Sequence, residues 1–115
     1  MSIPITVCGF EIGAPVGSPT IISSTKPGNM AAGAYSYRIT YRTRYGETTP
    51  GPASLPGTVV PVTPAVTGSL LLTNLPIVTV DYVAALRIYR SSVGNVPPYF
   101  FVAEVSDPMT SVYLD

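Results

Sequence analysis

Three arginines lie in one short run of the sequence, RITYRTRYGETTPGPAS (residues 38–54), where they alternate with apolar and hydroxyl-bearing side chains. A row made of Arg38, Arg42 and Arg44 could bind a phosphate, a sugar or a carboxylate, because guanidinium groups pair with planar and charged oxygen acceptors. A ligand site would need convergent partner residues at a cleft, and the sequence shows none. We therefore interpret the row as the solvated outer face of a strand, whose long stems cover apolar neighbours. The alternative is that these arginines contact acidic residues of a neighbouring subunit.

Catalytic side chains are scarce. The chain has no histidine and one cysteine, Cys8, which therefore lacks the imidazole that usually activates a thiol nucleophile. Two pairs of carboxylates could in principle form an acid/base pair: Glu47 with Asp81, and Glu104 with Asp107. Glu47 lies in a Gly-Glu-Thr turn, where we expect a solvated carboxylate, and Asp107 begins an Asp-Pro turn. We expect a protein that is not an enzyme and that has neither a cofactor nor a metal site.

The composition limits the possible partners. Six basic residues balance six acidic ones, so the net charge attracts neither nucleic acid nor an anionic membrane. Only 10% of the 115 residues are charged, against about 25% in a typical soluble domain. A neutral surface of this kind is typical of a subunit covered in an assembly. No basic residue precedes the first apolar residues, so we expect no secretory signal and folding in a cytoplasm.

The elements that must position these side chains are expected to be strands. Proline and glycine are spread throughout the chain and leave no room for a long helix. Alternation and turn signals predict strands at 35–45, 69–75, 84–92, 99–105 and 111–115, with weaker candidates at 20–24 and 57–63. The fold class is therefore all-β, a sandwich of about seven short strands.

The best alternation predicts the core. It places Tyr37, Ile39 and Tyr41 on the buried face of the 35–45 strand, against Leu71, Leu86 and Ile88. Phe100 and Phe101 are adjacent in a predicted strand, so one of them must face away from the core. That phenylalanine either marks a contact surface or is covered by a loop.

Two longer stretches resemble a known family. YSYRITYRTRYGETTPGPAS (35–54) resembles the F and G strands of a fibronectin type III or immunoglobulin-like domain. LRIYRSSVGNVPPYFFVAEVSDPMTSVYLD (86–115) resembles its C, C′ and E strands. Together they cover about half the chain, in an order that implies either circular permutation or a module cut from a tandem array at an unusual point. The arrangement, with LLTNLP (71–76) and RIYR (87–90), is similar to small modules in structural proteins of tailed bacteriophages.

This resemblance implies a non-enzymatic virion structural protein, assembled in the bacterial cytoplasm. We expect a capsid decoration or cement protein that binds the major capsid protein or other virion subunits, as a homo-oligomer or in many copies of a symmetric assembly. A tail or head–tail connector component is the alternative within this class. A carbohydrate-binding or adhesion module is a further alternative and would need a planar aromatic platform. Neither nucleic acid nor a membrane is an expected partner.

Residues 1–20 lie outside the two stretches that resemble the family. We expect them to form an extended N-terminal arm, separate from a sandwich domain at 21–115, with Ile3, Ile5, Val7 and Phe10 contacting an adjacent subunit by strand addition. The alternative is that residues 3–7 form the first strand of their own sandwich.

Overall fold

The structure is a computed structural model and describes residues 5–7, 10–60, 67–77, 83–107 and 109–115. All regular secondary structure in these residues is β-strand, as the sequence predicts. The structure confirms six predicted strands, with first and last residues that differ from the predicted ones: 20–24, 35–45, 69–75, 84–92, 99–105 and 111–115. The candidate at 57–63 is confirmed at its start, and its last residues lie outside the described part of the chain.

The larger sheet has four antiparallel strands in the order β12 (Val96–Val105), β11 (Val83–Ser92), β6 (Tyr37–Thr43) and β7 (Gly46–Glu47). β11 and β12 form the predicted hairpin. Its turn includes Gly94 and Asn95 with φ of 89° and 59°, the left-handed conformation that these residue types adopt most readily. The register pairs Ile88 of β11 with Ile39 of β6.

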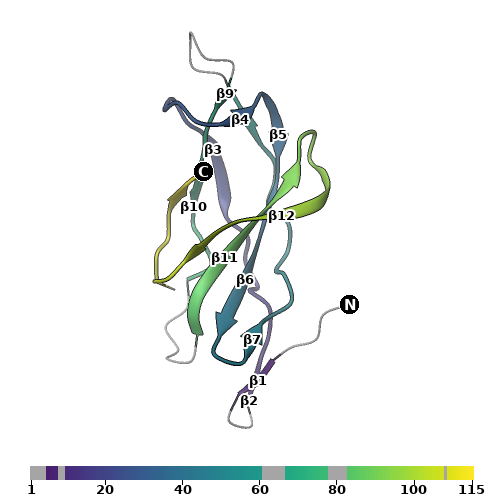
Figure 1. Ribbon diagram of the computed structural model, residues 1–115, viewed down its shortest axis with the longest axis vertical. Helices are drawn as coiled ribbons and strands as arrows, with labels where there is room; N and C mark the ends of the chain where they lie inside the picture. The colour runs from purple at the N-terminus through teal and green to yellow at the C-terminus, as the bar shows by residue number, and fades with distance from the viewer. Residues whose placement is uncertain (1–4, 8–9, 61–66, 78–82, 108) are drawn as a thin grey trace.

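The smaller sheet has three antiparallel strands in the order β13 (Tyr113–Leu114), β10 (Leu70–Thr73) and β3 (Thr20–Ser23). Figure 1 shows β12 crossing the molecule before the chain reaches β13. Two further pairs are β4 (Met30–Ala31) with β9 (Thr67–Gly68) and β5 (Gly33–Tyr35) with β8 (Gly57–Val59). A four-stranded and a three-stranded sheet together give seven main strands.

One hydrophobic core joins the two sheets. Side chains from both of them belong to a single buried cluster, and those that are fully buried include Tyr37, Ile39, Leu70, Leu72, Leu86 and Ile88. The predicted burial of Tyr37, Ile39, Leu86 and Ile88 is therefore confirmed. Tyr41 is half-buried against the same cluster, and its hydroxyl donates to the Pro76 carbonyl at 3.0 Å.

The predicted burial of Leu71 is wrong. Successive residues of a strand point to opposite faces, so the run Leu70-Leu71-Leu72 cannot place all three side chains in one core. Leu70 and Leu72 have no exposed surface, whereas Leu71 is half-buried on the other face of the smaller sheet.

The N-terminal segment forms a separate two-stranded ribbon. β1 (Ile5–Val7) pairs with β2 (Phe10–Ile12), and neither pairs with a described strand of the two larger sheets. Figure 1 shows this ribbon beyond the β7 end of the molecule. Residues 5–7 are therefore not the first strand of either sheet, and they pair with residues 10–12 instead.

Residues 13–19 lie on the body that the two sheets form. Pro15 and Pro19 are buried. A Cβ atom at Gly51 would lie 2.7 Å from the carbonyl oxygen of Pro15, so a glycine at position 51 permits this close approach. Part of the predicted 1–20 arm thus packs against the 21–115 domain.

Candidate functional site

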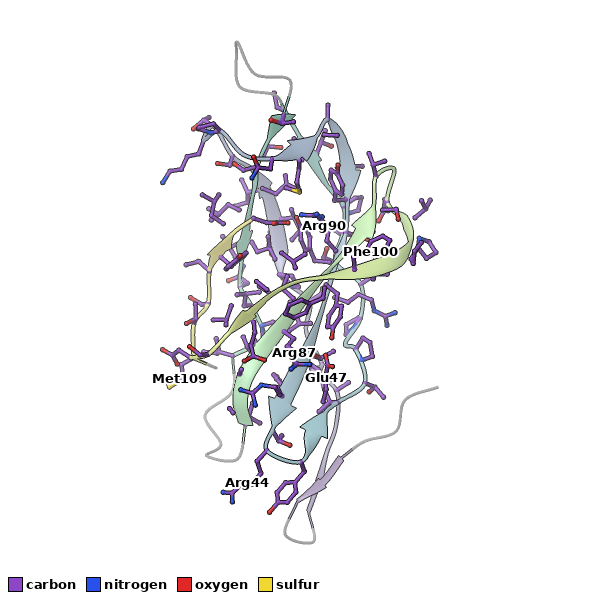
Figure 2. All side chains as sticks on the ribbon, in the orientation of Figure 1. Arg44, Glu47, Arg87, Arg90, Phe100 and Met109 are labelled. Atoms are coloured by element: carbon purple, nitrogen blue, oxygen red, sulfur yellow. The ribbon has the colours of Figure 1, made fainter. Side chains whose placement is uncertain are left out.

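The polar side chains of the larger sheet gather on its outer face, the face opposite the core. Directly paired residues of antiparallel strands share a face, and the register pairs Arg87 with Thr40, Tyr89 with Arg38, and Arg42 with Glu47. β12 adds Glu104 beside Arg87 and Phe101 beside Tyr89. Figure 2 shows Arg87 and Glu47 close together in the lower half of the body.

Ion pairs connect four of these residues. Glu104 Oε1 accepts from Arg42 Nε at 2.7 Å and from Arg87 Nε at 2.9 Å, and Arg87 Nη1 donates to Glu47 Oε1 at 3.1 Å. These hydrogen bonds from Arg42 and Arg87 lower the pKa of Glu104, and the bond to Glu104 raises the pKa of Arg87. Arg42 therefore contacts a carboxylate of its own chain.

Glu47 is a hydrogen-bond acceptor at the centre of this face. Besides Arg87, it accepts from the hydroxyls of Thr40 and Tyr89. Burial, followed by the hydrogen bond to Glu47, raises the pKa of Tyr89. The prediction of a solvated Glu47 is wrong, because β7 folds back on β6 and brings this carboxylate over the sheet.

Arg38 lines a cavity of about 310 Å³ on the outer face. Its Nε donates to the Gly51 carbonyl at 2.8 Å, and its guanidinium carbon lies 5.8 Å from the centre of the Tyr99 ring. Arg38 forms no ion pair with any carboxylate in the described residues. The complete lining consists of Arg38, Thr40, Glu47, Thr48, Pro50, Tyr89 and Tyr99.

The predicted arginine row does not form a single site. β6 ends at Thr43, so Arg44 lies in the turn beyond the strand, where it is exposed and 5.7 Å from the centre of the Tyr45 ring. Figure 2 shows Arg44 at the lower end of the body, away from Arg87 and Glu47. Arg38, Arg42 and Arg44 therefore have three different environments.

The predicted N-terminal contact residues lie on the separate ribbon. Ile5 and Val7 are in β1, Phe10 is in β2, and Ile3 lies outside the described residues. The register pairs Ile5 with Ile12 and Val7 with Phe10, so these four positions share one face of the ribbon.

A second polar cluster was missed by the sequence analysis. Arg90 lies on the core side of β11, opposite Tyr37, and its Nη1 donates to Asp115 Oδ2 at 2.7 Å. The Tyr37 hydroxyl donates to the same oxygen at 2.6 Å, and burial, followed by this bond, raises the pKa of Tyr37. Arg90 continues the spacing of Leu86 and Ile88, so strict alternation would have placed it inward.

Large apolar side chains are exposed on both sheets. Phe100 and Phe101 on β12 are 56% and 55% exposed, although alternation predicted that only one would leave the core. β12 is the last strand of its sheet, so even its core-side positions lack a neighbour on one side. On the smaller sheet, Ile22, Leu71 and Leu114 form a cross-strand row on the outer face, which we call the apolar row.

Searches of protein-family models, of curated proteins and of solved structures find no match to this chain. Within the part of the chain that the structure describes, no three His, Cys, Asp or Glu side chains are grouped so that they could hold a metal ion. No helix in the same residues is long and apolar enough to cross a membrane.

Proposed function

We propose that this protein is a non-enzymatic structural protein of a bacteriophage particle, and that it decorates the capsid by binding the major capsid protein in many copies. A tail or head–tail connector component is the alternative within this class. The observation that carries the proposal is the uncharged, apolar character of the surface. It is supported by the pairing of charged side chains with one another and by two apolar features, one on the smaller sheet and one on the N-terminal ribbon.

Six charged residues are paired with one another within the chain. The chain has twelve charged residues, and among the described residues the ion pairs join six: Arg42, Arg87, Arg90, Glu47, Glu104 and Asp115. Few charges remain to keep a free monomer soluble. A surface of this composition suits a subunit whose neighbours cover it.

The apolar row is the first uncovered feature. Ile22 and Leu114 are 48% and 41% exposed, and both flank Leu71 across the sheet. The β1–β2 ribbon is a second apolar feature. Four apolar positions share one of its faces, and an isolated two-stranded ribbon is at best marginally stable in water. We propose that this face contacts a neighbouring subunit in the particle.

Strand order supports an immunoglobulin or fibronectin type III-like sandwich. Such folds place A, B and E side by side in one sheet and G, F, C and C′ in the other. With β6 and β7 as F and G, and β10 to β13 as B, C, C′ and E, the observed neighbours β12-β11-β6-β7 and β13-β10 follow. An unpermuted reading, with β3, β6, β10 and β11 as B, C, E and F, gives the same order in the larger sheet and the pair β3-β10, and leaves β13 as an additional edge strand. The proposed fold family is therefore independent of the permutation.

Subunit binding is favoured over carbohydrate binding. The rings of Tyr89 and Phe101 meet edge to face, with centroids 5.7 Å apart and planes at 71°. A sugar ring stacks on a flat aromatic surface, and this pair does not provide one.

Copy number on purified particles tests the proposal. Particles are purified from infected cells and the chain is counted by quantitative mass spectrometry against the major capsid protein. Hundreds of copies per particle are expected for a decoration protein, and a handful would assign it to the tail or connector. Its absence from intact particles would overturn the proposal.

A further inference from the structure

The cavity on the outer face has few free hydrogen-bond donors. The hydroxyls of Thr40 and Tyr89 donate to Glu47, and the Thr48 hydroxyl donates to the Thr49 carbonyl at 3.0 Å. The Tyr99 hydroxyl is paired with Ser36 Oγ at 2.8 Å. Every hydroxyl that lines the cavity is therefore engaged within the protein.

Arg38 supplies the donors that remain. Its Nε is bonded to the Gly51 carbonyl, and its guanidinium group lies beside the Tyr99 ring, so the side chain is fixed in place. Its two terminal nitrogens form no hydrogen bond with the described residues. Glu47, the one carboxylate of the lining, is already paired with Arg87. The cavity therefore presents an unbalanced positive charge with unused N–H groups between aromatic walls.

We propose that this cavity binds a carboxylate, and that its source is an acidic side chain of a neighbouring subunit. A guanidinium group donates two parallel hydrogen bonds to a carboxylate, which brings acceptors and a negative charge to Arg38. The aliphatic stem of the acidic residue lies against Tyr89, Tyr99 and Pro50. A neutral polyol fits less well, because it brings no negative charge to pair with the Arg38 guanidinium.

The volume suits such an occupant. About 310 Å³ is at the lower limit of ordinary small-ligand sites, and it accommodates one acidic side chain with the backbone that carries it. The identity of the source depends on the proposed role in a particle. The preference for a carboxylate depends only on the cavity.

Nuclear magnetic resonance of the whole chain tests the preference. The probe is N-acetyl-glutamate N-methylamide, and the reference compound is the glutamine analogue, which has the same shape without the charge. We expect saturable shifts of the Arg38 Nε–H and of the Tyr89 and Tyr99 rings with the glutamate probe alone. Arg38→Gln should weaken binding at least about tenfold, because hydrogen bonds to charged groups contribute most strongly. Arg44→Gln is the matched control and should leave binding unchanged.

If Arg38→Gln fails to fold, a second variant still tests the carboxylate site. Arg38→Lys retains the charge but loses the planar pair of donors, and it should also bind more weakly than the parent chain. Equal binding of the glutamine analogue, or unchanged binding in both Arg38 variants, would overturn the carboxylate site. Equal binding of inorganic phosphate would overturn its selectivity, and tighter binding of glucuronate would overturn the protein source. All of these outcomes are independent of the particle copy number, so failure here and failure of the proposed function are distinguishable.

Discussion

Glu104 shows how single charged residues are used on the outer face. Its carboxylate accepts from Arg42 and Arg87, and these bonds lower its pKa below the ordinary value of 4.5. A carboxylate with a lowered folded-state pKa contributes stability above its unfolded pKa, and that contribution is lost as the pH falls through the folded-state value. Because Glu104 is exposed, solvent screens the contribution and keeps it small.

Glu104→Gln should therefore lower the melting temperature slightly at pH 7. The difference from the parent chain should shrink as the pH falls through the lowered folded-state pKa of Glu104, and it should disappear once both chains carry a neutral group at this position. It should also shrink in about 1 M salt, because the Debye length there is about 3 Å. Thermal unfolding followed by circular dichroism from pH 3 to pH 7 measures this. A difference that grows as the pH falls would contradict the assigned ion pairs.

Tyr37→Phe tests the buried polar cluster. The substitution removes a hydroxyl that donates to Asp115 Oδ2 and leaves Arg90 as the partner of that oxygen. We expect the free energy of unfolding to fall by about 1 to 3 kcal/mol, the usual result of removing one partner from a buried hydrogen bond. Tyr45→Phe is the matched control, since that ring is 57% exposed, and urea unfolding should show it unchanged. Equal stabilities for the two variants would argue against the cluster.

At the scale of the element, the core face of β6 should dominate stability. Ile39 is fully buried between the sheets, so Ile39→Ala should cost about 2 to 5 kcal/mol, from lost transfer energy and the cavity left behind. Ile22→Ala removes the same atoms from the apolar row, where Ile22 is 48% exposed, and should cost less than about 1 kcal/mol. Urea midpoints of the two variants give the comparison. Similar losses would contradict the assignment of core and outer face.

Alternation predicted the elements well where one face of a strand is buried. β6 and β11 were predicted with the correct buried face because hydrophobic and polar residues alternate along them. The prediction failed for Leu71, because three consecutive leucines fit either phase of the alternation. The two-residue strands β4 and β9 are too short to carry a recognisable pattern.

The candidate site was less predictable, because its contacts join distant parts of the chain. Glu47 meets Tyr89, 42 residues later, and Arg42 meets Glu104, 62 residues later. No local sequence pattern around Glu47 indicates Tyr89 as its partner. The Glu47 carboxylate, which lies in a turn motif, was therefore predicted to be solvated. The sequence indicated Arg38 as a candidate contact residue. It could not distinguish the environment of Arg38 from that of Arg42, because only the fold determines which arginine faces a carboxylate.

At the scale of the whole molecule, the apolar row and the β1–β2 ribbon lie in different places. The chain extends 53 Å along its longest axis and 26 and 18 Å along the others. The β1–β2 ribbon lies at one end of this shape, and the apolar row lies on the outer face of the smaller sheet. A subunit with two separate contact regions can join neighbours on two sides, as a many-copy assembly requires.

Deleting residues 2–12 tests the ribbon as a contact that the body does not need for folding. β1 pairs only with β2 among the described strands, and the segment packed on the body begins near Pro15. The truncated chain should therefore remain folded, with a melting temperature within a few degrees of the parent, and should fail to bind particles. Calorimetry of the purified chain and sedimentation with particles that lack it give the two measurements. A truncated chain that is unfolded in isolation would show that the ribbon is part of the domain's own structure.

Single substitutions test which face of the ribbon contacts the particle. Phe10 lies on the face shared with Ile5, Val7 and Ile12, whereas Thr6 pairs with Glu11 on the opposite face. Phe10→Asp places a charge where we propose an apolar contact, and it should abolish particle binding without unfolding the body. Thr6→Asp introduces the same charge on the other face and should leave particle binding intact. If both variants bind as the parent does, the ribbon is not the contact; if both fail, the contact is not confined to the apolar face.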